Sequence, residues 1–140
     1  MPAYTTQSEL VTRFGQEEIL GLANDDGTID AAVVTAAIGA AGATIDSYIG
    51  TRYALPLATV PARVATVAQD MARYELYTIE APKAVKDKYD AAIAWLKDVS
   101  AGRAALDVPA PPAADSSQSG NVIRLKGEDR FTSREELRKL

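Results

Sequence analysis

Apolar residues between positions 30 and 101 recur every three or four residues, which is the spacing of one face of an α-helix. Proline-containing segments divide them into three runs, and the pattern predicts long helices over residues 30–51, 61–80 and 83–101. The side chains expected to be mostly buried on these helices are Val33, Ile45, Tyr48, Val64, Val67, Met71, Tyr74, Tyr89, Ile93 and Leu96.

The first thirty residues carry signals for shorter elements. Thr6 and Glu9 have the spacing of a capping box, which predicts a short helix ending at Gly15. A second short helix follows over residues 16–23, and the Asn-Asp-Asp-Gly run at 24–27 has the composition of a turn. The pattern therefore predicts an all-α fold, a small bundle of three long and two short helices.

The composition changes after residue 106. Residues 107–121 are rich in Pro, Ala and Ser and contain little to bury, so they are expected to form a linker between a helical body at 1–106 and a C-terminal segment at 122–140. Residues 122–125 have the composition of a short strand. The fold is thus expected to include an extended C-terminal arm whose apolar residues are Val122, Ile123, Leu125, Phe131, Leu137 and Leu140.

Charge and missing residue types exclude several functions. The net charge is −4, with 9 basic and 15 acidic residues before position 121 and 6 basic and 4 acidic after it, so the body lacks the basic face of a nucleic-acid binder. The chain has no Cys and no His, which excludes disulfides, thiolate chemistry, His-based triads and His/Cys zinc sites. No signal segment or membrane-spanning run is expected, and a soluble cytoplasmic protein is the default expectation.

No catalytic, cofactor-binding or metal-binding set is predicted. Residues 24–30 resemble part of a calcium loop, but two principal ligand positions hold Leu22 and Val33, which favours a turn followed by an N-cap. The tyrosines at helical spacing are interpreted as core packing rather than as base-stacking platforms. Neighbouring carboxylates are interpreted as solvated helix faces at Glu17/Glu18, Asp87/Asp90 and Glu135/Glu136.

The stretch "DSYIGTRYALPL" at residues 46–57 predicts a distinctive corner between two helices. Arg52 lies in the last helical turn, where the helix dipole favours a cation, and Pro56 ends the helical pattern. Arg52 is expected to be held by helix-end carbonyls or by a carboxylate, Asp70 or Asp46. Tyr53 and Leu55 are expected to fold back over the helix ends. The predicted structural corner comprises Arg52, Tyr53, Leu55, Pro56 and Asp70.

Five stretches of the chain resemble those of one protein family. They are this corner, "VPARVATVAQDMARYELY" after it, "VKDKYDAAIAWLKDVSAGRAAL" further on, "SELVTRFGQEEILGLAN" near the start and "DRFTSREELRKL" at the end. This family comprises the small gp36-type proteins of Mu-like phages and prophages. The resemblance covers nearly the whole chain except the Pro-rich linker. That family is similar in role to head–tail connector, adaptor or head-completion proteins. The resemblance implies a non-enzymatic structural protein for virion assembly, located at the head–tail junction of the virion and in the host cytoplasm during assembly.

The resemblance also implies partners. It implies a homo-oligomeric ring, usually a dodecamer, that binds below the portal protein and meets a tail-side connector or tail-terminator protein. DNA would pass through the channel without sequence-specific binding, and no membrane is involved. The segment beyond the linker is expected to bind a neighbouring chain through Val122, Ile123, Leu125, Phe131, Arg134 and Leu137.

Two other functions are compatible with a helical body and an apolar arm. One is a regulatory binding protein whose C-terminal arm folds onto a partner, as in antitoxins. The other is a DNA-binding helical module, which would bind DNA with a strong dependence on salt.

Overall fold

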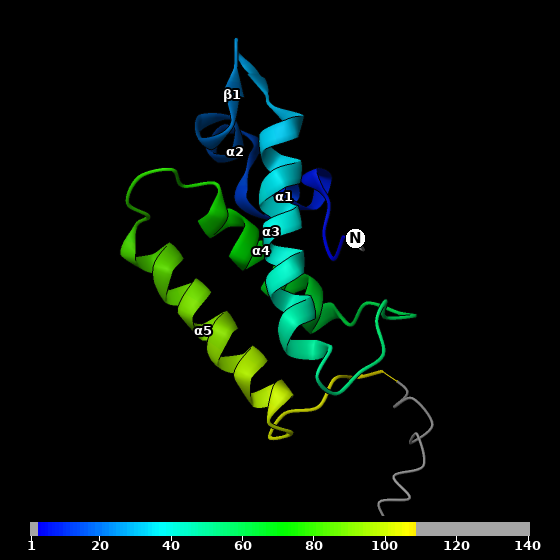
Figure 1. The fold of residues 1–140 in the computed structure, drawn as a ribbon. Coiled ribbons are helices and arrows are strands. Elements are labelled where there is room, and N and C mark those ends of the chain that lie inside the picture. The colour runs from blue at the N-terminus through cyan, green and yellow to red at the C-terminus, as the bar shows by residue number, and fades with distance from the viewer. Residues whose placement is uncertain (1–2, 109–140) are drawn as a thin grey trace, which may run out of the picture. The chain divides into compact units, whose positions relative to one another are not determined.

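The computed structural model describes residues 3–108 and contains five helices and one β-hairpin (Figure 1). The elements are α1 (Gln7–Phe14), α2 (Gln16–Leu22), β1 (Asn24–Asp25), β2 (Thr28–Ile29), α3 (Ala31–Ile49), α4 (Ala62–Glu75) and α5 (Lys83–Ser100). The predicted bundle of three long and two short helices is confirmed, and the hairpin is an addition to it. The predicted arm and its short strand lie outside the described residues.

The first helix begins at the predicted capping box. The Glu9 backbone N–H donates to the Thr6 hydroxyl at 3.3 Å, and the Thr6 backbone N–H donates to the Glu9 carboxylate at 2.8 Å. Gly15 ends α1 with φ 94°, a conformation that favours glycine, and α2 follows at once. These hydrogen bonds lower the pKa of Glu9 from its ordinary value, the largest cause being the bond from the Thr6 backbone and the next the bond from the Thr5 hydroxyl.

This capping box makes stability depend on pH. The pKa of Glu9 is lower in the folded chain than in the unfolded chain. The Glu9 carboxylate therefore contributes its full stabilisation above the ordinary glutamate pKa, and this stabilisation is lost as the pH falls through the lowered pKa of the folded state. We expect Glu9→Gln to remove about 0.3–1 kcal/mol of stability at neutral pH, the usual value for a carboxylate in a first helical turn. Melting curves of both proteins between neutral and acidic pH should converge at low pH. Parallel curves across that range would contradict this assignment.

The turn predicted at residues 24–27 is the tip of the hairpin. Asn24 pairs with Ile29 and Asp25 with Thr28, and the two residues between them, Asp26 and Gly27, both have positive φ. This geometry matches the type I′ turns favoured by Asp-Gly sequences. Two strands of two residues give no alternating pattern, so only the turn was visible in the sequence.

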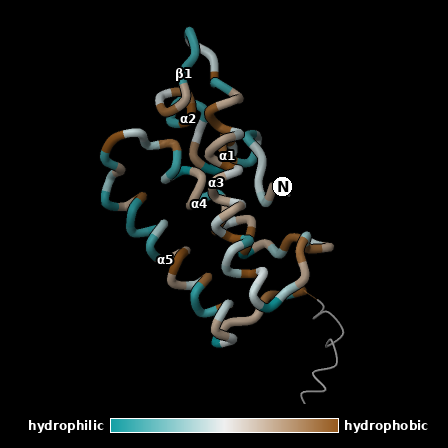
Figure 2. The backbone as a smooth tube through the Cα atoms, in the orientation of Figure 1, coloured by the Kyte–Doolittle hydropathy of each residue, from teal (hydrophilic) through white to brown (hydrophobic). Residues whose placement is uncertain are grey.

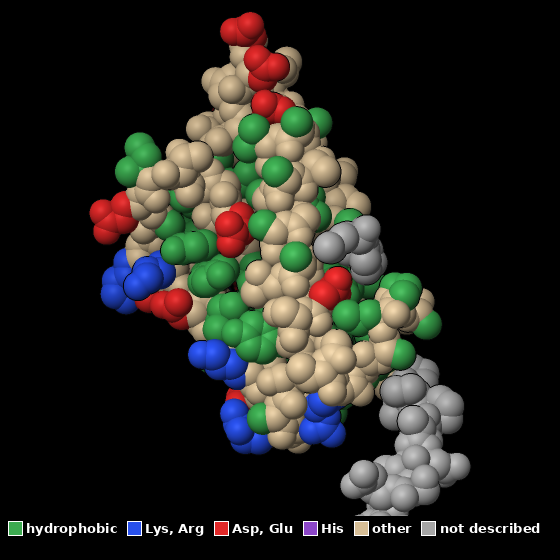
Figure 3. All heavy atoms as spheres, in the orientation of Figure 1, with side chains coloured by type: hydrophobic (Ala, Val, Ile, Leu, Met, Phe, Trp, Pro, Cys, Tyr) green, Lys and Arg blue, Asp and Glu red, His purple; other side chains and the backbone are tan. Residues whose placement is uncertain are grey.

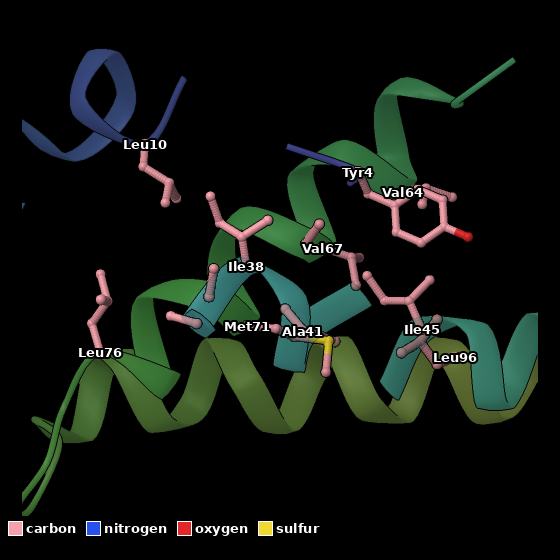
Figure 4. Packing of buried hydrophobic residues seen from close by; sticks show 14 of the residues in the cluster. Tyr4, Leu10, Ile38, Ala41, Ile45, Val64, Val67, Met71, Leu76 and Leu96 are labelled. Carbon is pink, nitrogen blue, oxygen red and sulfur yellow. The ribbon is translucent and has the colours of Figure 1, made fainter. Parts of the chain in front are cut away.

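The three long helices pack against one another, and α1 packs on α3 and α4. Figure 4 shows large apolar side chains from α3, α4 and α5 converging with Leu10 of α1 and Tyr4 of the segment before it. Along α5 hydrophilic residues alternate with apolar ones (Figure 2), and its buried residues are Val85, Ala92, Leu96 and Val99. Of the residues expected in the core, those fully buried are Ile45, Val64, Val67, Met71 and Leu96.

Some details of the long helices differ from the predictions. Val33 is 40% exposed because Val34 and Ile38 of α3 point into the core instead, which rotates the buried face by one residue. Tyr48, Tyr74, Tyr89 and Ile93 are mostly buried as predicted, with a minor part of each residue still exposed.

The second long helix is shorter than predicted at both ends. Pro61 is the N-cap of α4 rather than its first residue, and the helix ends at Glu75 instead of near Glu80. Leu76 is buried at the helix end, and the chain then turns toward α5. The β-branched pair Thr78–Ile79 has low helix propensity, which is consistent with the early end.

Helix α5 ends at Ser100, one residue before the predicted end, and Gly102 follows with φ 78°. The backbone N–H groups of Gly102 and Arg103 donate to the carbonyls of Val99 and Asp98, at 3.1 and 2.8 Å, which is the Schellman pattern. The Arg103 guanidinium also contacts the Asp98 carboxylate at 2.6 Å. The body extends slightly beyond the predicted boundary, because Val108 still packs against the core.

Helix α3 is more apolar than the sequence analysis expected. By length and composition alone its 19 residues would suffice to cross a membrane, which corrects the expectation that no run approaches this length. In this fold α3 packs against α1, α4 and α5. The core helix of a soluble protein can have the same length and apolar composition as a membrane-spanning helix. Only 39% of the most apolar 18-residue stretch of α3 is buried, however, so an apolar face of this helix remains exposed.

Candidate functional site

The predicted corner follows the end of α3. The backbone N–H groups of Arg52 and Tyr53 both donate to the Ile49 carbonyl at 3.0 Å, which closes the helix. Leu55 then folds back, with its Cδ1 3.1 Å from where a Cβ on Gly50 would stand. The Leu55–Pro56 peptide bond is cis. A Cβ on Gly50 would also stand 2.8 Å from the Asp46 carbonyl oxygen, so a larger residue at position 50 would displace its neighbours.

Tyr53 connects this corner to the end of the helical body. Its ring packs against the core, and its hydroxyl accepts a hydrogen bond of 3.1 Å from the backbone N–H of Leu106, whose side chain is buried. The prediction that Tyr53 lies against the body is confirmed. The contact also holds the chain segment that follows α5 beside the corner.

The predicted carboxylate partners of Arg52 are wrong. Asp70 forms an ion pair with Arg13 of α1, with 2.9 Å between the charged groups, and Asp46 accepts a hydrogen bond from the hydroxyl of Tyr4. Within residues 3–108, Arg52 has no ion pair, and its guanidinium lies against Gly102 at the end of α5. A Cβ at that glycine would stand 1.7 Å from the Arg52 Nη1 atom.

The contact between Arg52 and Gly102 can be measured with a double-mutant cycle. We expect Gly102→Ala to cost about 1–2 kcal/mol through the strain of a Cβ at positive φ, with a smaller addition because the exposed end of Arg52 must move away. In an Arg52→Ala background only the backbone strain remains, about 1–2 kcal/mol. Urea unfolding of the four proteins gives the coupling between the two positions. Equal costs in both backgrounds would show that Arg52 moves aside freely.

Two ion pairs join the short helices to α4. The Arg13 guanidinium also donates to the Thr66 carbonyl and to Gln69, each at 3.0 Å, and Arg73 contacts Glu18 of α2 at 2.5 Å. Both guanidinium groups lie over the ring of Phe14, at 5.1 and 4.6 Å from its centroid. This arrangement fixes α1 and α2 on α4, and helical periodicity gave no indication of it.

Tyr4 is a buried residue that the sequence analysis missed. Its side chain is 4% exposed, and burial raises its pKa well above the ordinary tyrosine value, with the hydrogen bond to Asp46 as the next cause. The residue precedes the first helix, so no periodic pattern could mark it as part of the core. The contact ties the N-terminal segment to the last turn of α3.

The other tyrosines on the long helices act as packing residues, as predicted. The rings of Tyr74 and Tyr89 are stacked with centroids 4.2 Å apart, and Tyr48 packs against the core. Burial is the main cause that raises the pKa of Tyr89, followed by the charge of Glu75. These rings therefore join α3, α4 and α5 on one side of the bundle.

Polar side chains around the predicted turn serve structural roles. The Asn24 side chain accepts from the Gly27 N–H at 2.8 Å, and Asp30 caps α3 by accepting from the Ala32 and Val33 N–H groups. The interpretation as a turn followed by an N-cap is thus confirmed. Residues 3–108 contain no group of three His, Cys, Asp or Glu side chains able to hold a metal ion.

The predicted carboxylate pairs have different surroundings. Glu18 is half-buried in its ion pair with Arg73, Glu17 is exposed, and Asp87 pairs with Lys83 at 2.7 Å on the surface of α5. Asp90 is exposed as well. The predicted arm and the pair Glu135/Glu136 lie outside the described residues, as do the predicted partner-binding side chains Val122, Ile123, Leu125, Phe131, Arg134 and Leu137.

A small hollow adjoins the corner at the start of α4. Its volume is about 280 Å³, and its walls include Arg63, Trp95 and Asp107. The Arg63 guanidinium lies over the indole ring, 5.4 Å from its centroid. Such a lining can bind an apolar or aromatic side chain, but it contains no pair of groups placed for proton transfer.

Four large apolar side chains of the described region remain exposed. Leu55 and Val60 flank Pro56 in the segment between α3 and α4, which has no charged residue from Tyr53 to Ala62. Ile79 is 92% exposed between α4 and α5. Val33 on α3 is the fourth. Exposed apolar groups on short connecting segments are typical anchors for partner proteins.

Known phage proteins match this chain along nearly its whole length. The sequence model of the family "Bacteriophage Mu, Gp36" matches residues 4–124. The "Mu-like prophage FluMu protein gp36" of Haemophilus influenzae is 30% identical over 129 residues, which is 91% of this chain and 92% of that protein. "Gene product J" of Escherichia phage Mu is 26% identical over 136 residues, covering 95% and 96% of the two chains. The chain belongs to the gp36 family of Mu-like phages and is a phage-associated protein.

Proposed function

We propose that the protein is a structural subunit of a phage head–tail connector, an adaptor or head-completion protein that joins head to tail. The observation that carries this proposal is its membership in the Mu gp36 family over nearly its whole length. The resemblance of that family to connector proteins supplies the role. In this proposal the protein has no catalytic activity and acts through its surfaces alone.

The surfaces of the body support a role in assembly. Leu55, Val60 and Ile79 are large apolar side chains on connecting segments, where partner proteins can reach them. Residues 121–140 add six apolar residues beyond a Pro-rich linker, and their sequence has more basic than acidic residues, opposite to the body. A segment of this kind suits binding to a neighbouring chain with an acidic surface.

We assign the partners as follows. Copies of the chain form a ring, dodecameric in the particle, which binds the portal protein on one side and a tail-side connector or tail-terminator protein on the other. DNA passes through the ring without sequence-specific contacts, and the acidic balance of residues 1–120 is consistent with DNA that slides rather than binds. The protein acts at the head–tail junction of the virion.

The proposal can be tested with the portal protein of the same phage. We expect the purified chain to bind portal rings and to add a ring of density on one side, visible by electron microscopy. Two matched variants of the same segment test whether Ile79 is an apolar anchor: Ile79→Asp replaces the apolar side chain by a charge, whereas Glu80→Gln changes only the charge. Loss of portal binding in Ile79→Asp alone indicates an apolar anchor. Failure to bind portal, together with a stable complex with a host enzyme, would favour the regulatory binding function instead.

A further inference from the structure

The outward face of α3 lacks the polar cover of a normal surface helix. No residue from Ala31 to Ile45 is charged, whereas the exposed positions of α5 are rich in Lys and Asp. A helix that contacts water on one face usually carries charged and polar residues there. The exposed residues along the middle of this α3 face are Ala32, Val33, Ala36, Gly39, Ala40, Ala43 and Ser47.

Gly39 has no role in packing within the described chain. A Cβ added there would have no atom within 4 Å, so no intramolecular contact requires a glycine. Glycine inside a helix costs about 0.5–1 kcal/mol relative to alanine. A glycine with alanines one turn before and after it allows the backbone of a second helix to approach closely. Within residues 3–108 no second helix approaches α3 at this residue.

The two ends of α3 carry opposite charges. Exposed Asp25 and Asp26 lie in the hairpin before its N-terminus, and exposed Arg52 follows its C-terminus. The Arg52 guanidinium lies against Gly102 at the end of α5, and the last turns of that helix also carry Lys97 and the ion pair between Arg103 and Asp98. Figure 3 shows acidic side chains at one end of this face and basic side chains at the other, and the surface of α3 between them is uncharged apart from acidic groups at its two sides.

We propose that α3 packs antiparallel against α3 of a second copy of this chain, crossing at Gly39 and Ala40. This register is self-consistent, because the exposed positions pair with one another across the two-fold axis: Gly39 with Ala40, Ala36 with Ala43, and Ala32 with Ser47. The antiparallel direction brings the acidic hairpin of each copy to the basic end of the other. A parallel pair would place like charges together, which is unfavourable.

This dimer is distinct from the proposed ring. Neighbours in a cyclic ring are related by rotation about the ring axis, so they cannot meet through a local two-fold axis. The antiparallel pair is therefore a form of the free protein that covers α3 before assembly. The inference does not rest on the connector function, and either one can fail without the other.

The absence of cysteine from the chain allows a direct test of direction. We would prepare Ala36→Cys and Ala43→Cys in the full-length protein and oxidise each alone and both mixed. In the proposed register the mixture forms disulfide dimers. Each variant alone has its two cysteines about 10 Å apart along the helix axis, beyond disulfide reach, and should react at least about fivefold less. Reaction of each variant alone, or of none, would overturn the antiparallel pair.

A second test removes the apolar contact. Sedimentation of the full-length chain should show a dimer, and Ala40→Glu should weaken association at least about tenfold, since it buries two uncompensated charges. Ala94→Glu is the matched control at an exposed position of α5 and should leave the dimer unchanged, and both variants should keep the parent helical content. High salt should weaken the parent dimer because its ends attract through charge. A parent that stays monomeric overturns the proposal, and so does one that instead binds vesicles of anionic lipid through α3.

Discussion

Replacing Leu96 with Ala is expected to lower the free energy of unfolding by about 2–5 kcal/mol, the range for a leucine removed from a packed core. Leu96 is completely buried on the inner face of α5, among side chains contributed by α3 and α4 (Figure 4). The substitution removes these contacts and leaves a cavity, because helices fixed by several other contacts close over the gap only in part.

The loss should be measured by urea unfolding, with Ile79→Ala as the control. Ile79 is 92% exposed, so its truncation should change stability by less than about 0.5 kcal/mol. A loss below about 1 kcal/mol for Leu96→Ala would mean that this side chain does not lie in a tightly packed core.

Deleting residues 121–140 is expected to leave a folded helical body and to abolish the joining of heads to tails. The core of the described region is built from residues between Tyr4 and Leu106, and the body is closed by the hydrogen bond from Leu106 to Tyr53. The melting temperature of the truncated protein should therefore be nearly unchanged. The deletion removes the predicted partner-binding residues, so attachment to the portal, to the next subunit or to the tail side should be lost.

Two measurements separate the possible outcomes of this deletion. Thermal melting of the truncated protein reports on the body, and particle assembly in its presence reports on the segment. A milder variant with Phe131 and Leu137 both replaced by Ser should reproduce the assembly defect without shortening the chain. If the truncated body unfolds, the segment belongs to the core. If heads and tails still join normally, the segment is dispensable for assembly.

Local signals in the sequence were sufficient for most of the secondary structure. The capping box at Thr6 and Glu9, the helix end at Gly15, the turn at 24–27 and the N-cap that follows it all hold in the structure. Each depends on interactions within a few residues, which is why the order of residues is enough to predict them. Helix spacing likewise placed Leu96 and Met71 in the core.

Side-chain partners across the bundle could not be predicted in the same way. The sequence offered Asp46 and Asp70 to Arg52, whereas Tyr4 and Arg13 hold these two carboxylates. Which pairs meet depends on how α1 and the N-terminal segment lie on α3 and α4, and helical periodicity carries no information on that placement. Val33 shows the same limit, because a small rotation of α3 exchanges one apolar neighbour for another.

The sequence by itself determined that this is a helical protein of the Mu gp36 family, because periodic apolar faces, local caps and the corner motif are properties of short stretches of chain. The tertiary structure alone decided that Arg52 lies on Gly102, that Tyr53 holds Leu106, and that one face of α3 stays apolar and exposed. The physical reason is that a helix rich in small apolar residues has no strong preference for which face it buries. Only packing against α1, α4 and α5 selects one.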